Sequence, residues 1–225
     1  VTGSINLSKR FKVSPFFIGA VIIGFGTSAP EFAVSIMASL QESGDLALAN
    51  IVGSNITNVG LVLGATALIA PLTIEPRQFD KETPPLIIAT FIICVFAWNN
   101  YLSRLEGFTM IILLFIYLLK SFKSNECISD NIDEESSFMD TKRPAFQICL
   151  TVVGIVMLII GANLIVQGAT NIARSIGISE WFIGVSIVAL GTSLPEIVSS
   201  VIAAKRGHGD MAIGNVFGSN IFNIL

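Results

Sequence analysis

The chain has 225 residues, of which 52% are hydrophobic and only 13% are charged, with a formal net charge of −3 and a mean hydropathy of +0.77. Soluble domains carry roughly a quarter of charged residues, so this composition excludes the ordinary soluble classes. We therefore predict an all-α membrane protein whose main partner is the lipid bilayer, and we expect no nucleic-acid partner.

Apolar segments follow one another along the chain, and runs of about 18 or more apolar residues are typical of membrane-spanning helices. The chain is expected to open within a first helix that ends near Leu7. Seven further segments predict the second to eighth helices: 16–40, 46–72, 84–102, 107–119, 145–173, 181–204 and 211–225. We expect truncation at both ends, because alignment of the two halves places Val1 inside a helix and leaves about 60 residues to follow Leu225.

The sequence contains an internal duplication. The hexapeptide GTSAPE at 26–31 returns as GTSLPE at 191–196, and at this offset of 165 residues 21 of 47 consecutive positions are identical. One duplicated unit therefore accounts for two repeat halves. The predicted halves are 1–123 (the end of helix 1 and helices 2–5, motif region 14–64) and 144–225 (helices 6–8, incomplete, motif region 179–225).

Lysine and arginine predict the orientation, since short cytoplasmic loops carry an excess of these residues. The loops after odd-numbered helices hold eleven of the thirteen basic residues, whereas the loops after even-numbered helices hold only Arg104 and Arg174. Five helices separate the two motifs, so the repeats enter the membrane in opposite directions. Transporters with inverted repeats place their ion sites near the bilayer midplane, where the repeats meet.

The segment 124–143 is predicted to be an acidic cytoplasmic linker between the two halves. It contains six acidic residues, but they lack the spacing and the central glycine of an EF-hand loop. A solvated linker is therefore favoured over a regulatory calcium site.

The hexapeptides carry the first candidate site residues. A carboxylate inside an apolar segment is expensive and is a functional hypothesis by default. The proline before each glutamate has no N–H, so it disrupts the helix and frees backbone carbonyls. Each copy is expected to cluster two hydroxyls and a carboxylate on one helical face: Thr27, Ser28 and Glu31 in the first, and Thr192, Ser193 and Glu196 in the second.

A second shared block, GSNITN from Gly53 and GSNIFN from Gly218, adds neutral oxygens. These belong to Ser54, Asn55 and Asn58, and to Ser219, Asn220 and Asn223. For the asparagines alone, interhelical hydrogen bonding explains the pattern as well as cation binding does. Two carboxylates with hydroxyls, amides and carbonyls suit calcium or sodium, whereas zinc or copper would recruit histidine or cysteine. The sequence predicts a cation transporter without enzymatic activity or a cofactor.

The paired blocks GTSxPE and GSNIxN resemble the alpha-1 and alpha-2 repeats of the cation/calcium exchanger superfamily, particularly its prokaryotic sodium/calcium antiporters. The resemblance implies an inverted-repeat exchanger fold, with five plus five helices in the complete protein. Helices two, three, seven and eight would form the ion core, against which helices one and six slide. We expect a multi-pass protein of the cell (plasma or inner) membrane that acts as a monomer and exchanges Ca²⁺ for Na⁺.

The resemblance also implies roles for the motif residues. The central calcium ligands would be the carboxylates of Glu31 and Glu196, beside the backbone oxygens of Thr27 and Thr192. The flanking sodium sites would be lined by Ser28, Ser54, Ser193 and Ser219, and the middle position by Asn58 and Asn223. Many relatives carry an acid at one of these last two positions, whereas both are amides here, so potassium dependence and stoichiometry stay open.

Other functions are less favoured. The proton-coupled branch of the superfamily carries an acid close to the asparagine that opens its second block, and 50–53 (NIVG) does not. A cation channel would use similar oxygens but needs a continuous pore, and inverted repeats with broken helices favour alternating access. An intramembrane protease would need a base or two aspartates at membrane depth, and neither is present.

Overall fold

The computed structural model describes residues 1–11, 13–73, 76–99, 101–124, 144–179 and 189–225, and in this part of the chain every regular element is helical. The predicted all-α class is confirmed. The predicted linker lies outside the described residues except for Ser124, and the first eight residues of the predicted seventh helix also lie outside them.

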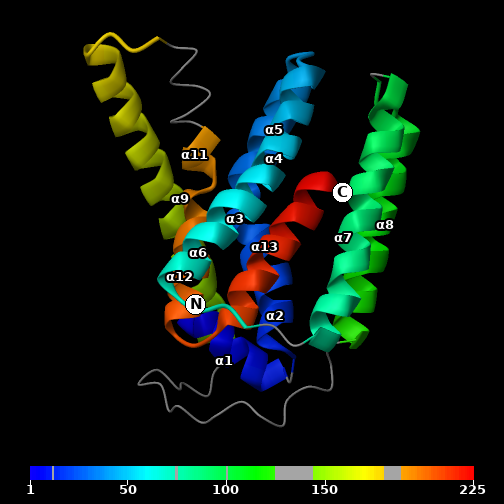
Figure 1. Cartoon of the computed structure of the whole chain (residues 1–225), viewed down its shortest axis with the longest axis vertical. Coiled ribbons are helices and arrows are strands. Elements are labelled where there is room, and N and C mark those ends of the chain that lie inside the picture. Colours follow the sequence, from blue (N-terminus) through cyan, green and yellow to red (C-terminus); the bar gives the residue numbers. More distant parts are fainter. Residues whose placement is uncertain (12, 74–75, 100, 125–143, 180–188) are drawn as a thin grey trace.

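The first half contains α1 (Thr2–Phe11) and two interrupted helices (Figure 1). One consists of α2 (Pro15–Ile18), the π-helix η1 (Gly19–Gly24), α3 (Phe25–Thr27) and α4 (Ala29–Leu40). The other consists of α5 (Gly44–Thr57), the π-helix η2 (Asn58–Leu63) and α6 (Gly64–Ile69). They are followed by α7 (Pro76–Phe96), the 3₁₀ turn η3 (Ala97–Asn99) and α8 (Arg104–Ser124).

The second half contains α9 (Pro144–Ser175), α11 (Ala189–Thr192), α12 (Leu194–Lys205) and α13 (Gly209–Ile224). In Figure 1, α4 ends at the upper side of the molecule, whereas its counterpart α12 ends at the lower side. The two copies of the motif therefore run in opposite directions, as the inverted repeat predicts.

Several helices are long and apolar enough to cross a bilayer. Four single helical stretches of the described chain qualify: 44–69, 76–99, 104–123 and 144–175. The pair 15–27 and 29–40 also qualifies when it is taken as one span bent by 45°. Large apolar side chains such as Phe115 and Met157 are exposed on these helices, which fits contact with lipid rather than water. The protein is an integral, multi-pass membrane protein.

The start of the fourth predicted helix is wrong by eight residues, because α7 begins at Pro76 and continues through Pro84 and Pro85. Proline is well tolerated in the first helical turn, which suits Pro76. The polar segment before Pro84 is held by tertiary contacts that hydropathy does not detect. The amide of Gln78 donates to the Ser14 hydroxyl at 3.2 Å, and the buried carboxylate of Glu82 accepts from Tyr117.

A close helix crossing joins the two halves, where α13 passes α2 and η1 at backbone distance. A Cβ atom on Gly214 would lie 2.3 Å from the carbonyl oxygen of Phe16, and one on Gly218 would lie 2.0 Å from that of Ala20. On the facing helix, a Cβ on Gly19 would lie 2.2 Å from the carbonyl oxygen of Met211. Small residues let membrane helices approach this closely, so the glycines determine the separation of the repeats.

The turn after α4 repeats in the backbone after α12. The amide of Ser43 donates to the carbonyl of Ala38 at 2.9 Å, and the amide of His208 donates to that of Ala203 at 3.0 Å. The residue that precedes each of these donors is left-handed: Glu42 with φ 58° in one copy, and Gly207 with φ 80° in the other. The same turn therefore has glycine at its left-handed position in one repeat and glutamate, for which this backbone conformation is strained, in the other.

Replacing Glu42 with glycine should stabilise the protein, because a left-handed conformation is unfavourable for a residue with a Cβ by about 1–2 kcal/mol. We expect a higher melting temperature in detergent. The reciprocal change, Gly207→Ala, should lower it. Equal melting temperatures for the two variants would contradict the assigned turn geometry.

Candidate ion-binding site

Both motif helices are interrupted at a single serine. Ser28 (φ −79°, ψ 2°) separates α3 from α4, and Ser193 (φ −86°, ψ 1°) separates α11 from α12. The proline that follows lies in the first turn of the new helix, where its missing N–H is tolerated. Each break thus ends one short helix and begins another.

The breaks put both glutamates in the first turn of a helix, Glu31 in α4 and Glu196 in α12. Their exposed fractions are 3% and 0%, and they are close enough to repel each other electrostatically. The positive end of each helix dipole favours a carboxylate in this position. Two acidic groups are therefore held together inside the protein, near the break in each repeat.

The hydroxyls of each repeat interact with the glutamate of the other repeat. Ser28 Oγ donates to Glu196 Oε1 at 3.4 Å, and Thr192 forms a side-chain hydrogen bond with Glu31. The spacing predicts that Thr27, Ser28 and Glu31 share one helical face, but the helix is interrupted at Ser28, so the rule does not apply across the break. The site is built across the repeat interface instead.

Four buried oxygens of the two motif blocks receive no hydrogen bond within the described chain: Glu31 Oε2, Glu196 Oε2, Ser193 Oγ and Asn58 Oδ1. An unsatisfied buried polar atom is unfavourable by about 1–3 kcal/mol, so a native protein is expected to give each of these oxygens a partner. Two carboxylate oxygens, one amide oxygen and one hydroxyl are ligands that hard cations prefer. This donor set suits calcium or sodium as a transported ion.

The second block supplies the remaining predicted residues. Ser54 and Ser219 are buried, and Ser219 Oγ donates to the carbonyl of Gly24 at 3.3 Å. The amide of Asn58 donates to Asn220 Oδ1 at 3.1 Å, and that of the half-buried Asn223 donates to Asn55 Oδ1 at 3.4 Å. These bonds join the two repeats, which supports the interhelical explanation of the asparagines. The Oδ1 atom of Asn58 accepts no hydrogen bond from the described chain and is therefore available as a cation ligand.

Two further asparagines, Asn50 and Asn215, were not predicted as site residues. Asn215 donates to Ser199 and Ser200 at 3.0 and 2.9 Å, and its Oδ1 accepts from Thr27 at 3.3 Å. Asn50 donates to the carbonyl of Glu31 at 3.0 Å. Both therefore position the helix that bears a glutamate. Asn50 and Asn215 occupy equivalent positions of the two repeats, 165 residues apart, and this match is the sequence signal that could have identified them.

No group of three or more histidine, cysteine, aspartate or glutamate residues gathers within the described chain. The groups that contact the two glutamates from the opposite repeat are neutral hydroxyls. A divalent cation matches their combined charge, and a redox or thiolate-bound metal would find no suitable ligands in this part of the described chain.

The chain is similar to known proteins over nearly its whole length. The profile of a family described as sodium/calcium exchanger protein matches residues 1–123 and 146–225. The putative antiporter CaxA of Alkalimonas amylolytica is 37% identical over 232 residues, which cover 100% of this chain and 72% of that protein. The sodium/calcium exchanger MaX1 of Methanosarcina acetivorans is 32% identical, with 100% and 75% covered. A solved structure of the sodium-calcium exchanger NCX_Mj has a TM-score of 0.84 and 36% identity, over 99% of this chain and 71% of that one.

Proposed function

Because the chain belongs to the sodium/calcium exchanger protein family, we propose that it exchanges calcium for sodium across the cell membrane by alternating access. The family and the likeness to NCX_Mj establish the exchanger fold and cation exchange as the general activity. The coupling of calcium to sodium is supported chiefly by one observation, the two buried glutamates held together by hydroxyls of the opposite repeat.

In this proposal, Glu31 and Glu196 bind the calcium ion directly, beside the backbone oxygens of Thr27 and Thr192. Ser28, Ser54, Ser193 and Ser219 line the sodium sites, and Asn58 and Asn223 occupy the middle position. Within the described chain the two buried carboxylates have no basic partner, and such a pair is strongly unfavourable unless cations compensate it. One divalent ion or two monovalent ions provide the same compensation, so calcium and sodium compete for one pair of charges.

Alternating access then follows from the inverted construction. Each glutamate begins a half-helix that points away from the repeat interface, α4 towards one side of the molecule and α12 towards the other (Figure 1). The predicted halves, 1–123 and 144–225, would contribute equivalent parts of one site, and we expect the monomer to be the transporting unit. The motion that the resemblance implies is a sliding of the first and sixth helices, α1 and α9, against the ion core, which opens the site to one side of the membrane at a time.

Calcium-45 uptake into sealed vesicles that contain the purified protein tests the proposal. Opposed gradients of sodium, potassium and protons are imposed in turn, with the membrane potential clamped. We expect uptake to require an outward sodium gradient. Uptake driven by a proton gradient alone would indicate a proton-coupled exchanger. Uptake that also requires potassium would indicate a potassium-dependent exchanger. Calcium flux without any counter-gradient would indicate a channel.

The substitutions Asn58→Ala and Asn223→Ala should alter the apparent sodium dependence more than the calcium affinity. An amide oxygen contributes a dipole, whereas each carboxylate contributes a full charge in a region of low dielectric constant, where charge dominates. We expect a changed sodium concentration at half-maximal exchange with calcium exchange retained. Complete loss of exchange by either variant, with normal expression, would make the amide as important as a carboxylate.

A further inference from the structure

The buried amide of Asn215 contacts both repeats without being a candidate ion ligand. It lies near the middle of α13 and is 1% exposed. Its nitrogen donates to the hydroxyls of Ser199 at 3.0 Å and Ser200 at 2.9 Å, both on α12. It also donates, at a longer distance of 3.4 Å, to the backbone carbonyl of Glu196. The amide therefore ties the first two turns of α12 to α13.

The oxygen of the same amide faces the first repeat. Asn215 Oδ1 lies 3.3 Å from the hydroxyl of Thr27, which also forms a side-chain hydrogen bond with Glu196. The single hydrogen of this hydroxyl is shared between these acceptors and the carbonyl of Ile23, at 3.0 Å. The contacts form a ring, because the amide binds the backbone of Glu196 directly and its carboxylate through Thr27. This ring connects two residues of the ion site that come from different repeats.

The backbone that carries the amide is also held in place. The residue before Asn215 is Gly214, where α13 crosses α2 at backbone distance. On the facing helix η1, a Cβ atom on Gly24 would lie 3.2 Å from the carbonyl oxygen of Asn215. The amide thus projects from a part of α13 that is packed tightly against the first repeat. A group that positions metal ligands needs such support, because small displacements of the ligands change the affinity.

The equivalent amide of the first repeat connects less. Asn50 donates to Ser35 at 2.9 Å and to the carbonyl of Glu31 at 3.0 Å. At the offset of 165 residues these are the counterparts of two contacts made by Asn215. Within the described chain both partners of Asn50 belong to its own repeat, whereas Asn215 also reaches the opposite one. The two amides are therefore equivalent in sequence but not in what they join.

We propose that Asn215 is a positioning residue that sets the size of the ion site, and thereby its preference for calcium over larger divalent ions. The inference rests on the proposed function, in which the carboxylate of Glu196 and the backbone oxygen of Thr27 bind calcium. Calcium takes oxygen ligands at about 2.3–2.6 Å, and the larger barium ion needs longer distances. Ligands that are held at fixed positions favour the ion that fits between them.

The competing explanation is that the amide only joins helices, as polar side chains do in many membrane proteins. That role predicts lower stability and an equal loss of affinity for every divalent ion. Positioning predicts a larger loss for calcium than for barium, because a loosened ring still accommodates the larger ion. The ratio of the calcium affinity to the barium affinity therefore separates the two explanations.

Equilibrium binding of calcium-45 to the purified protein in sodium-free detergent solution, with barium as competitor, measures this ratio without a transport assay. We expect Asn215→Ala to bind calcium at least about tenfold more weakly, as is typical when a partner of a metal ligand is removed, and to lose less affinity for barium. Asn50→Ala should lose less calcium affinity, because it releases contacts within one repeat. The double variant S199A/S200A keeps the amide but removes its partners on α12. It should also lower the ratio, and it provides an independent test if Asn215→Ala does not fold.

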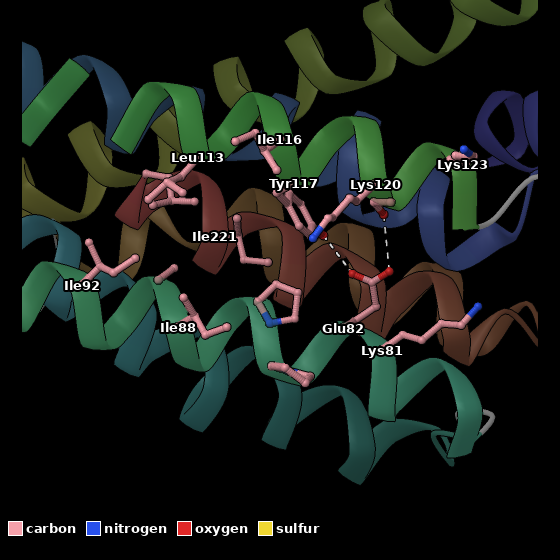
Figure 2. Close-up of a pocket in the computed structure, with 15 residues that line it drawn as sticks. Lys81, Glu82, Ile88, Ile92, Leu113, Ile116, Tyr117, Lys120, Lys123 and Ile221 are labelled. Carbon is pink, nitrogen blue, oxygen red and sulfur yellow. Dashed lines mark hydrogen bonds between the residues drawn. The ribbon is translucent and has the colours of Figure 1, made fainter. Parts of the chain in front are cut away.

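The matched control is Tyr117→Phe, which removes a buried hydrogen bond between two helices that carry no candidate ion ligand. Figure 2 shows Tyr117 of α8 pointing toward Glu82 of α7, and its hydroxyl donates to this carboxylate at 3.2 Å. This variant should lower the melting temperature and leave the ratio of the calcium affinity to the barium affinity unchanged.

The outcomes distinguish this inference from the proposed function. An unchanged ratio in Asn215→Ala, an equal calcium loss in Asn50→Ala or an equal fall of the ratio in the control would each overturn the inference, while calcium binding by the parent protein would still support the ion site. Absence of saturable calcium binding by the parent protein would overturn the calcium site itself, and this inference with it.

Discussion

Replacing Glu196 with glutamine, or Glu31 with glutamine, is expected to abolish calcium exchange while the protein still folds. Each substitution removes half of the negative charge of the pair and keeps the shape of the side chain. At about 4 Å and an effective dielectric constant near 20, one unit charge contributes about 4 kcal/mol to the interaction with another, which is roughly a thousandfold in affinity. A divalent ion loses more than this, so exchange should fall below detection.

Folding should survive, because the glutamine amide relieves the repulsion between two buried carboxylates. The measurement combines calcium-45 exchange with a size-exclusion profile and a melting curve. Glu42→Gln is the matched control, since it makes the same chemical change at an exposed turn. Robust calcium exchange by either pair variant would remove these residues from the ion site. Loss of exchange by the control would point to a non-specific effect.

A single added methyl group at Gly218 should destabilise the protein strongly. The Cβ of Gly218→Ala would lie 2.0 Å from the carbonyl oxygen of Ala20 and 2.5 Å from its Cα, so the helices must separate. Overpacking of this kind typically destabilises by about 1–3 kcal/mol, and a backbone contact has no rotamer with which to escape. We expect poor expression, aggregation or a melting temperature lower by several degrees.

Gly154→Ala is the control for this prediction, because Gly154 is exposed on α9 and no described residue lies within 4 Å of the position that the added methyl group would take. Alanine is preferred over glycine inside a helix, so this variant should be as stable as the parent or slightly more stable. Equal stability of the two variants would show that α13 and η1 do not cross at backbone distance.

Much of the fold was predictable because hydropathy and repetition are properties of sequence alone. The predicted third helix, for example, corresponds closely to the stretch from Gly44 to Ile69. The start of α7 was missed because the segment before Pro84 is polar. Its helical conformation depends on partners such as Ser14 and Tyr117, which are distant in the chain.

The sequence indicated which residues are candidates for the site, but it did not predict which of them are hydrogen-bonded to one another. Spacing within a helix indicates which side chains share a face, but the helix ends at Ser28, so the rule stops applying there. The partner of Ser28 is Glu196, 168 residues away, and such a contact depends on how the two repeats cross. The role of Asn215, which reaches α12 and Thr27 at once, depends on the same crossing.

Because each carboxylate is hydrogen-bonded by the opposite repeat, neither half contains a finished site. A protein made of one such half could complete it only by pairing with a second copy inserted upside down in the same membrane. The present chain has the organisation of such an antiparallel homodimer whose two orientations are joined in tandem. Two copies on one chain are present in equal numbers, whereas separate copies would have to insert in both orientations and then meet.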